Sequence, residues 1–197
     1  MVRHLLAVVA LALLISSPAL ARHPTQVVGN SRAITGDRVA SVQDRPEADS
    51  SDVATPRAVV EALVESYSSE AGERPEWDRY RSLFLPDARL ISTGRDSTGK
   101  PVRRVRTVQQ VVESGDTEQR AEAHLVERLL HTEIARFGDI AHVLCTYGVF
   151  DSPDDAEPAA RGVGSLQVWY DGARWWIVTL AWHPEREGAP IPERYGG

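Results

Sequence analysis

Residues 161–183 constrain the fold more than any other part of this sequence, because they predict two β-strands joined by a tight turn. Asp171-Gly172 marks the turn, since glycine readily adopts the positive φ that short hairpins require. The flanking residues are rich in Val, Ile, Trp and Tyr, which favour strands. Side chains alternate along a strand. The second strand therefore has two apolar faces, formed by Trp175 and Ile177 and, opposite them, by Trp176, Val178, Leu180 and Trp182.

Both faces of this second strand must be covered, because each carries large apolar side chains. Helices of the same chain can cover one face. The face that contains Trp176 is too large an apolar surface to remain exposed to solvent, and we expect a second subunit to cover it. The sequence therefore predicts a homodimer.

The N-terminus predicts a secretory signal. Arg3 and His4 form a short basic region, Leu5–Ile15 is an apolar run too short to span a bilayer, and Ala19-Leu20-Ala21 matches a cleavage site. We expect residues 1–21 to be removed and the mature protein to be exported, to the periplasm or the medium, without remaining in a membrane. An uncleaved membrane anchor is the alternative. Residues 22–54 are polar, lack a sustained period and predict a disordered linker.

Charge and cysteine content exclude several classes of protein. The net charge is −6, which argues against general nucleic-acid binding because that function needs a basic surface. The single cysteine, Cys145, has no partner within the chain for a disulfide. It lies in a strand-like run, where we expect a small buried side chain rather than a nucleophile.

Residues 55–197 predict one α+β domain. Thr55-Pro56 suits the start of a helix, and Val59, Val60 and Leu63 then recur at helical spacing. A second helix, a short pair of strands and a third helix follow, with helical sequence to about residue 127. Strands are predicted at about 129–137 and 140–150, before the final hairpin. Helices followed by a run of strands are typical of the α+β class.

Several motifs then resemble one superfamily. Residues 83–88 (LFLPDA) resemble a recurrent F-x-P-D-A entry into the first strand, and residues 171–178 (DGARWWIV) resemble a D-G-x-W-x-I last strand. Residues 136–143 with Thr146-Tyr147, and Trp182 with the tail 190–195, are similar to exported bacterial members. The domain thus resembles the nuclear transport factor 2-like superfamily, of cystatin-like fold, which includes SnoaL-like cyclases and ketosteroid isomerases. The resemblance implies a curved antiparallel sheet wrapped around helices, a cone with a mostly apolar pocket, and dimers whose sheets pack together.

The catalytic set of the isomerase-type relatives is not identifiable here. Asp87 and Asp139 lie in turn-like contexts, and Thr179 and Ala181 occupy last-strand positions where many relatives carry histidines. His183 can partly substitute for them. We therefore predict binding of a small apolar molecule, with no catalytic residue assigned. An isomerase, cyclase or dehydratase acting on an apolar carbonyl compound is one alternative, and an interaction module with a filled cone is another.

Two groups of polar residues are candidates for binding sites. The histidines lack compact ligand spacing, so no metal and no cofactor are predicted; they are His124, His131, His142 and His183. The arginines of the short returning strand fit either an anionic ligand or a charged edge that discourages aggregation; they are Arg103, Arg104 and Arg106.

The predicted pocket follows from strand alternation and the resemblance together. One face of the last strand is expected inside the cone, with polar-tipped side chains from the second helix and the middle strands joining it. An aromatic wall with a few hydrogen-bonding groups suits an apolar ligand with one polar end. The predicted ligand-binding residues are Tyr80, His131, Tyr147, Trp175, Ile177, Thr179 and His183.

Overall fold

The computed structural model describes residues 45–116 and 125–196. The predicted signal peptide and residues 22–44 of the predicted linker lie outside the described residues. Residues 45–54 are packed against the domain: Val53 is 4% exposed, and its carbonyl accepts a hydrogen bond from the Trp175 amide at 3.0 Å. Asp52 pairs with Arg79 at 2.7 Å. The packed chain therefore begins before the boundary that the sequence predicted at residue 55.

The helices begin where the sequence places their caps. Helix α1 (Pro56–Tyr67) is capped by the Thr55 hydroxyl, which accepts a hydrogen bond from the Ala58 amide. Helix α2 (Trp77–Ser82) is short, and α3 (Val108–Gly115) opens with a capping box between Thr107 and Gln110. No described helix has the length and hydropathy needed to cross a membrane.

Six strands form one sheet within the described residues, in the order β2-β1-β6-β5-β4-β3. Their bounds are β1 (Phe84–Arg95), β2 (Pro101–Arg106), β3 (Val126–Phe137), β4 (Ile140–Phe150), β5 (Ala160–Tyr170) and β6 (Trp175–Pro184). The predicted turn between β5 and β6 is confirmed, with Gly172 at φ 99°. The α+β class with a closing meander is likewise confirmed.

The sheet is mixed, whereas the fold predicted from the resemblance has an antiparallel sheet. Strands β1 and β6 pair in parallel, and the other neighbours are antiparallel. A tight turn forces antiparallel pairing only between strands that it joins directly. Strands β1 and β6 are far apart in the chain, so only the packed sheet sets their relative direction.

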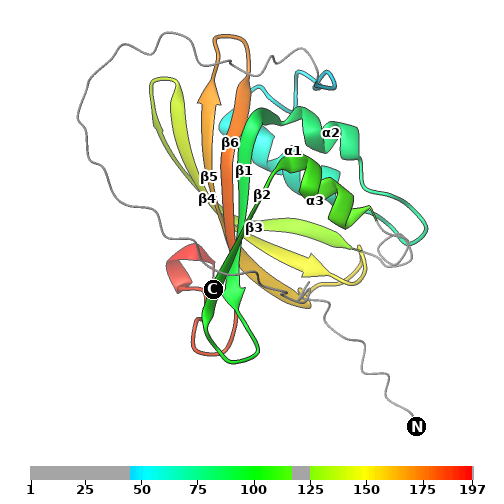
Figure 1. The fold of residues 1–197 in the computed structure, drawn as a ribbon, viewed down its shortest axis with the longest axis vertical. Coiled ribbons are helices and arrows are strands. Elements are labelled where there is room, and N and C mark those ends of the chain that lie inside the picture. Colours follow the sequence, from blue (N-terminus) through cyan, green and yellow to red (C-terminus); the bar gives the residue numbers. More distant parts are fainter. Residues whose placement is uncertain (1–44, 117–124, 197) are drawn as a thin grey trace, which may run out of the picture. The chain divides into compact units, whose positions relative to one another are not determined.

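The sheet curves, and helices α1, α2 and α3 lie on its concave face (Figure 1). The core fills the space between these layers. It includes Val59, Val60 and Leu63 of α1, with Leu90, Val143 and Leu166 of the sheet. This arrangement is the cone that the resemblance implied.

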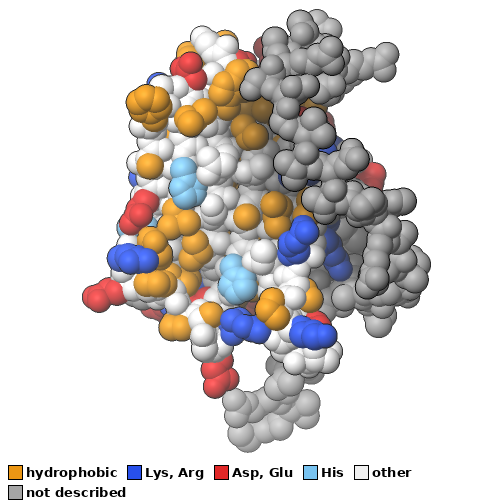
Figure 2. Space-filling model, turned by 60° about the vertical axis from the view of Figure 1, so that its left-hand side comes forward, with side chains coloured by type: hydrophobic (Ala, Val, Ile, Leu, Met, Phe, Trp, Pro, Cys, Tyr) orange, Lys and Arg blue, Asp and Glu red, His pale blue; other side chains and the backbone are white. Residues whose placement is uncertain are grey.

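The convex face carries the C-terminal tail. The Thr146 hydroxyl donates to the Tyr195 carbonyl at 2.6 Å, and Arg161 pairs with Glu185 at 2.8 Å. A 3-10 turn, η2 (Glu193–Tyr195), lies in this tail. Figure 2 shows groups of hydrophobic side chains on the surface, separated by histidine and charged side chains.

A β-bulge in β6 changes which side chains share a face. Ile177 pairs with Val168 and Thr179 with Gln167, so Val178 is an extra residue on β6. Strand alternation is therefore reset at this point. Leu180 pairs with the buried Leu166 and so faces the concave side, whereas Thr179 faces the convex side.

The bulge overturns the predicted apolar face that contained Trp176. Leu180 and Trp182 pack against the core on the concave side. Trp176 points to the other side, yet it is only 3% exposed, because the Arg174 guanidinium stacks 3.7 Å above its ring. The predicted face of Trp176, Val178, Leu180 and Trp182 therefore does not form one surface for a partner.

Candidate functional site

A cavity of about 130 Å³, partly open to solvent, lies between the helices and the concave face of the sheet. Apolar side chains make most of its wall: Val60, Leu63, Val64, Val111, Leu166 and Leu180. Its volume is close to the roughly 150 Å³ of an apolar cavity that holds one benzene molecule. The site therefore fits a ligand built around a single ring or a chain of similar size.

Three tyrosines line this cavity: Tyr67, Tyr80 and Tyr147. The rings of Tyr67 and Tyr80 lie 5.8 Å apart, and Tyr80 packs against Phe84 at 4.9 Å. Burial raises the pKa of Tyr147, and the nearby Glu127 raises it further. The Tyr147 phenol therefore stays protonated and can donate a hydrogen bond.

Glu127 and Cys145 line the cavity beside Tyr147. The Glu127 amide donates to the Ser68 hydroxyl at 2.9 Å, which ties the start of β3 to the end of α1 and fixes the position of the carboxylate-bearing residue. Burial raises the pKa of the Cys145 thiol to about 12. The cavity thus holds an acidic residue next to two groups that remain protonated at neutral pH.

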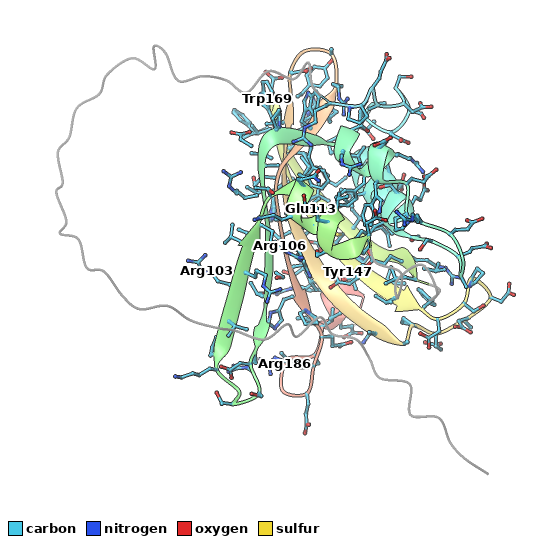
Figure 3. The ribbon with its side chains drawn as sticks, turned by 45° about the vertical axis from the view of Figure 1, so that its right-hand side comes forward. Arg103, Arg106, Glu113, Tyr147, Trp169 and Arg186 are labelled. Carbon is cyan, nitrogen blue, oxygen red and sulfur yellow. The ribbon has the colours of Figure 1, made fainter. Side chains whose placement is uncertain are left out.

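Arg106 brings a positive charge to the same cavity from the edge strand β2 (Figure 3). Its Nη1 donates to the Ser114 hydroxyl at 2.9 Å, and its guanidinium lies 5.8 Å from the centre of the Trp182 ring. Its Nε is shielded from solvent and has no hydrogen-bond partner among the residues that the structure describes. Burial lowers the pKa of Arg106 from its ordinary value, which records the cost of holding this charge partly away from water.

The structure places two of the seven predicted ligand-binding residues, Tyr80 and Tyr147, in the cavity wall. Trp175 and Ile177 do face the concave side, but they lie in the closed core and do not line the cavity.

The other three predicted residues lie on the convex side, which corrects the expected pocket. Thr179 and His183 follow the bulge in β6 and change face with it. His183 Nδ1 lies 2.8 Å from the Thr93 hydroxyl. A second bulge, at Leu130, turns His131 outward in the same way, beside Glu133. An alternation pattern read across a bulge assigns the wrong face to every residue that follows.

Twelve of the fourteen residues that line the cavity were not among the predicted ligand-binding residues; they include Tyr67, Glu127, Leu180 and Trp182. Tyr67 was detectable, because it lies one helical turn after Leu63 on the apolar face of α1. Glu127 was assigned to helical sequence, and the structure places it in β3. Among the described residues, no three His, Cys, Asp or Glu side chains gather as a metal site.

No protein-family model matches this sequence, and no curated protein sequence is similar to it at a significant level. Solved structures do resemble its fold. An NTF2-like (nuclear transport factor 2-like) protein of unknown function from Shewanella baltica OS155 is 14% identical, covers 67% of this chain and 98% of its own, and has a TM-score of 0.45. A second, from Methylobacillus flagellatus KT, is 15% identical, covers 66% and 89%, and has a TM-score of 0.46.

A third solved structure is described by its cystatin-like fold. This protein of unknown function from Nostoc punctiforme PCC 73102 is 15% identical, covers 66% of this chain and 93% of its own, and has a TM-score of 0.47. At such identities the likeness concerns the fold alone.

Proposed function

We propose that this protein binds a small, mainly apolar molecule in the cavity between its helices and its sheet. The observation that supports this function is the cavity of about 130 Å³, whose wall is largely apolar and carries a few polar groups. Small-molecule sites typically combine an apolar surface with a small number of hydrogen-bonding groups that orient the ligand. Here Tyr147 can donate a hydrogen bond and Glu127 can accept one.

Blocking the cavity tests this proposal. Val64 is 7% exposed and lines the cavity from α1, so Val64→Phe would place a ring in the ligand's volume. Val105 is 44% exposed on the edge strand β2, so Val105→Phe makes the same chemical change outside the cavity. Titration calorimetry with single-ring probes should show binding to the full chain and to Val105→Phe, and none to Val64→Phe. Equal binding by both variants would place the ligand elsewhere.

A proton-transfer enzyme is the second candidate function, and it is favoured by the acidic residue in the cavity. The Glu127 carboxylate would remove a proton next to the carbonyl group of an apolar substrate, while the protonated Tyr147 hydroxyl would donate to the oxyanion that forms. Exchange of such protons for deuterium in D₂O, followed by NMR on cyclic ketones, tests this reading. Loss of exchange in Glu127→Gln would support it, and exchange no faster than in buffer would reject it.

Export and dimer formation remain proposals alongside this function. The N-terminal 21 residues support export, and N-terminal sequencing of the secreted protein should begin at Arg22. A row of exposed apolar residues on the convex side supports a homodimer: Phe137, Ile140 and Trp169 pair side by side across β3, β4 and β5. Light scattering of the full chain and of Trp169→Asp tests the dimer. A monomeric full chain would reject it.

A further inference from the structure

We infer that the ligand is a small apolar carboxylic acid and that Arg106 binds its carboxylate. This inference rests on the proposed function, because it assumes that the cavity holds the ligand. It adds the chemical class of the ligand and the residue that selects it. The sequence left open whether the arginines of β2 bind an anion or form a protective edge, and the structure distinguishes between the individual arginines.

The three arginines of β2 do not share one environment. Arg106 pairs with Leu90, a core residue, and so faces the concave side, where it lines the cavity. Arg103 pairs with Thr93, whose hydroxyl contacts His183 on the convex side, and it is exposed. Figure 3 shows Arg103 directed away from the helices. The predicted protective edge therefore describes Arg103, whereas Arg106 belongs to the cavity.

The charge of Arg106 lacks a carboxylate partner among residues 45–116 and 125–196. It takes part in none of the ion pairs there. Arg79 shows the opposite arrangement, since it contacts Asp52, Glu65 and Glu76 at 2.7, 2.7 and 2.9 Å. A half-buried cation without a counter-ion is costly in the free protein, and an anionic ligand removes that cost.

The hydrogen-bonding pattern of Arg106 favours a flat, two-oxygen acceptor. Nη1 donates to the Ser114 hydroxyl, and Nε has no acceptor within residues 45–116 and 125–196. No acceptor among the described residues bonds Nη2, and a carboxylate can accept charge-assisted hydrogen bonds from the planar fork of a guanidinium. Trp182, whose ring centre lies 5.8 Å from the guanidinium carbon, also lines the cavity and offers an apolar surface to the rest of the ligand.

A carboxylate fits this cavity better than a phosphate group does. The cavity is about 130 Å³ and largely apolar, so a bulky, strongly hydrated dianion would fill it poorly. Glu127 lies in the same wall, and its negative charge would oppose a dianion more strongly than a monoanion. A ring or short hydrocarbon with a single carboxylate matches the volume of the cavity, its apolar wall and the Arg106 guanidinium.

Benzoate and benzamide test the inference, because they share one shape and differ in charge at pH 7. Titration calorimetry on the full chain should show benzoate binding about 10-fold to 100-fold more tightly than benzamide, the range expected for a charge-assisted hydrogen bond. The Arg106→Gln variant should bind the two probes about equally. The control variant, Arg103→Gln, should keep the preference for benzoate.

The outcomes separate this inference from the proposed function. Equal binding of both probes to the full chain, or a preference that survives in Arg106→Gln, would overturn the role of Arg106 and leave the cavity as a binding site for neutral molecules. A preference lost equally in Arg103→Gln would show general electrostatic attraction and also overturn it. Binding of neither probe at millimolar concentration would overturn both proposals.

Discussion

Replacing Gly162 by alanine should destabilise the domain and disturb the cavity together. Gly162 lies on β5 between Tyr147 of β4 and Pro184 of β6. A Cβ atom there would lie 2.5 Å from Tyr147 Cζ, closer still to the Tyr147 hydroxyl, and 2.8 Å from the His183 carbonyl oxygen. The carbonyl belongs to the backbone of the neighbouring strand and has little freedom to move. The tyrosine must therefore shift.

The size of the effect follows from these contacts. An ordinary van der Waals contact needs about 3.4 Å or more, so the Tyr147 ring would have to move by about 1 Å. Forcing an extra methyl group into a packed site costs about 1–3 kcal/mol of unfolding free energy. For a domain of this size each 1 kcal/mol lowers Tm by about 2–4 °C, which predicts a decrease of about 2–12 °C.

Thermal unfolding followed by circular dichroism measures this decrease, and Gly94→Ala is the matched control. A Cβ atom at Gly94, on β1, would meet no atom within 4 Å, so its Tm should stay the same or rise slightly. Adding Tyr147→Phe to Gly162→Ala removes the closest atom and should recover part of the loss, which a double-mutant cycle detects. Equal Tm values for the two glycine variants would refute the packing argument.

Two further predictions concern titratable groups. Burial opposes ionisation of Asp171, yet hydrogen bonds from the Trp176 indole and the Arg174 and Ala173 amides hold the pKa of this carboxyl below its ordinary value of 3.8. Because the pKa of Asp171 is lower in the folded state than in the unfolded state, the ionised carboxylate stabilises the folded protein above pH 3.8. This stabilisation is lost as the pH falls through the folded pKa. The free energy of unfolding in urea should therefore depend less on pH between 5 and 2 in Asp171→Asn than in the full chain. The same slope in both proteins would contradict this. For Cys145, a pKa of about 12 leaves almost no thiolate at pH 8, so a disulfide reagent should label this cysteine only after unfolding. Rapid labelling of the native protein would contradict this and show that the thiol is accessible through the cavity.

Local signals in the sequence were sufficient to predict features that depend on a few adjacent residues, such as helix starts and tight turns. Thr55-Pro56 marked the start of α1, and Asp171-Gly172 marked the hairpin turn, because capping and positive φ depend on a few adjacent residues. Burial of Cys145 also followed from its strand-like surroundings. The order of helices and strands predicted the α+β class, and it is the class observed.

The location of the cavity required the tertiary structure. The sequence contains no sign of the extra residue at Val178, since a bulge is defined by the partner strand and not by the strand that carries it. That one residue moves Leu180 and Trp182 into the concave side and takes Thr179 and His183 out of it. An undetected bulge reverses the face assigned to every later residue of the strand. For this reason part of the predicted site was wrong although the predicted class of fold was right.

The sequence by itself determined the class of fold, the capped helices, the closing hairpin and the presence of arginines on a short edge strand. Only the tertiary structure decided that β1 and β6 run in parallel and that Arg106 lines the cavity while Arg103 faces outward. The physical reason is the same in each case. Turns and caps are set by neighbours along the chain, whereas strand register, bulges and the environment of a charge are set by residues that are distant in sequence and adjacent in space.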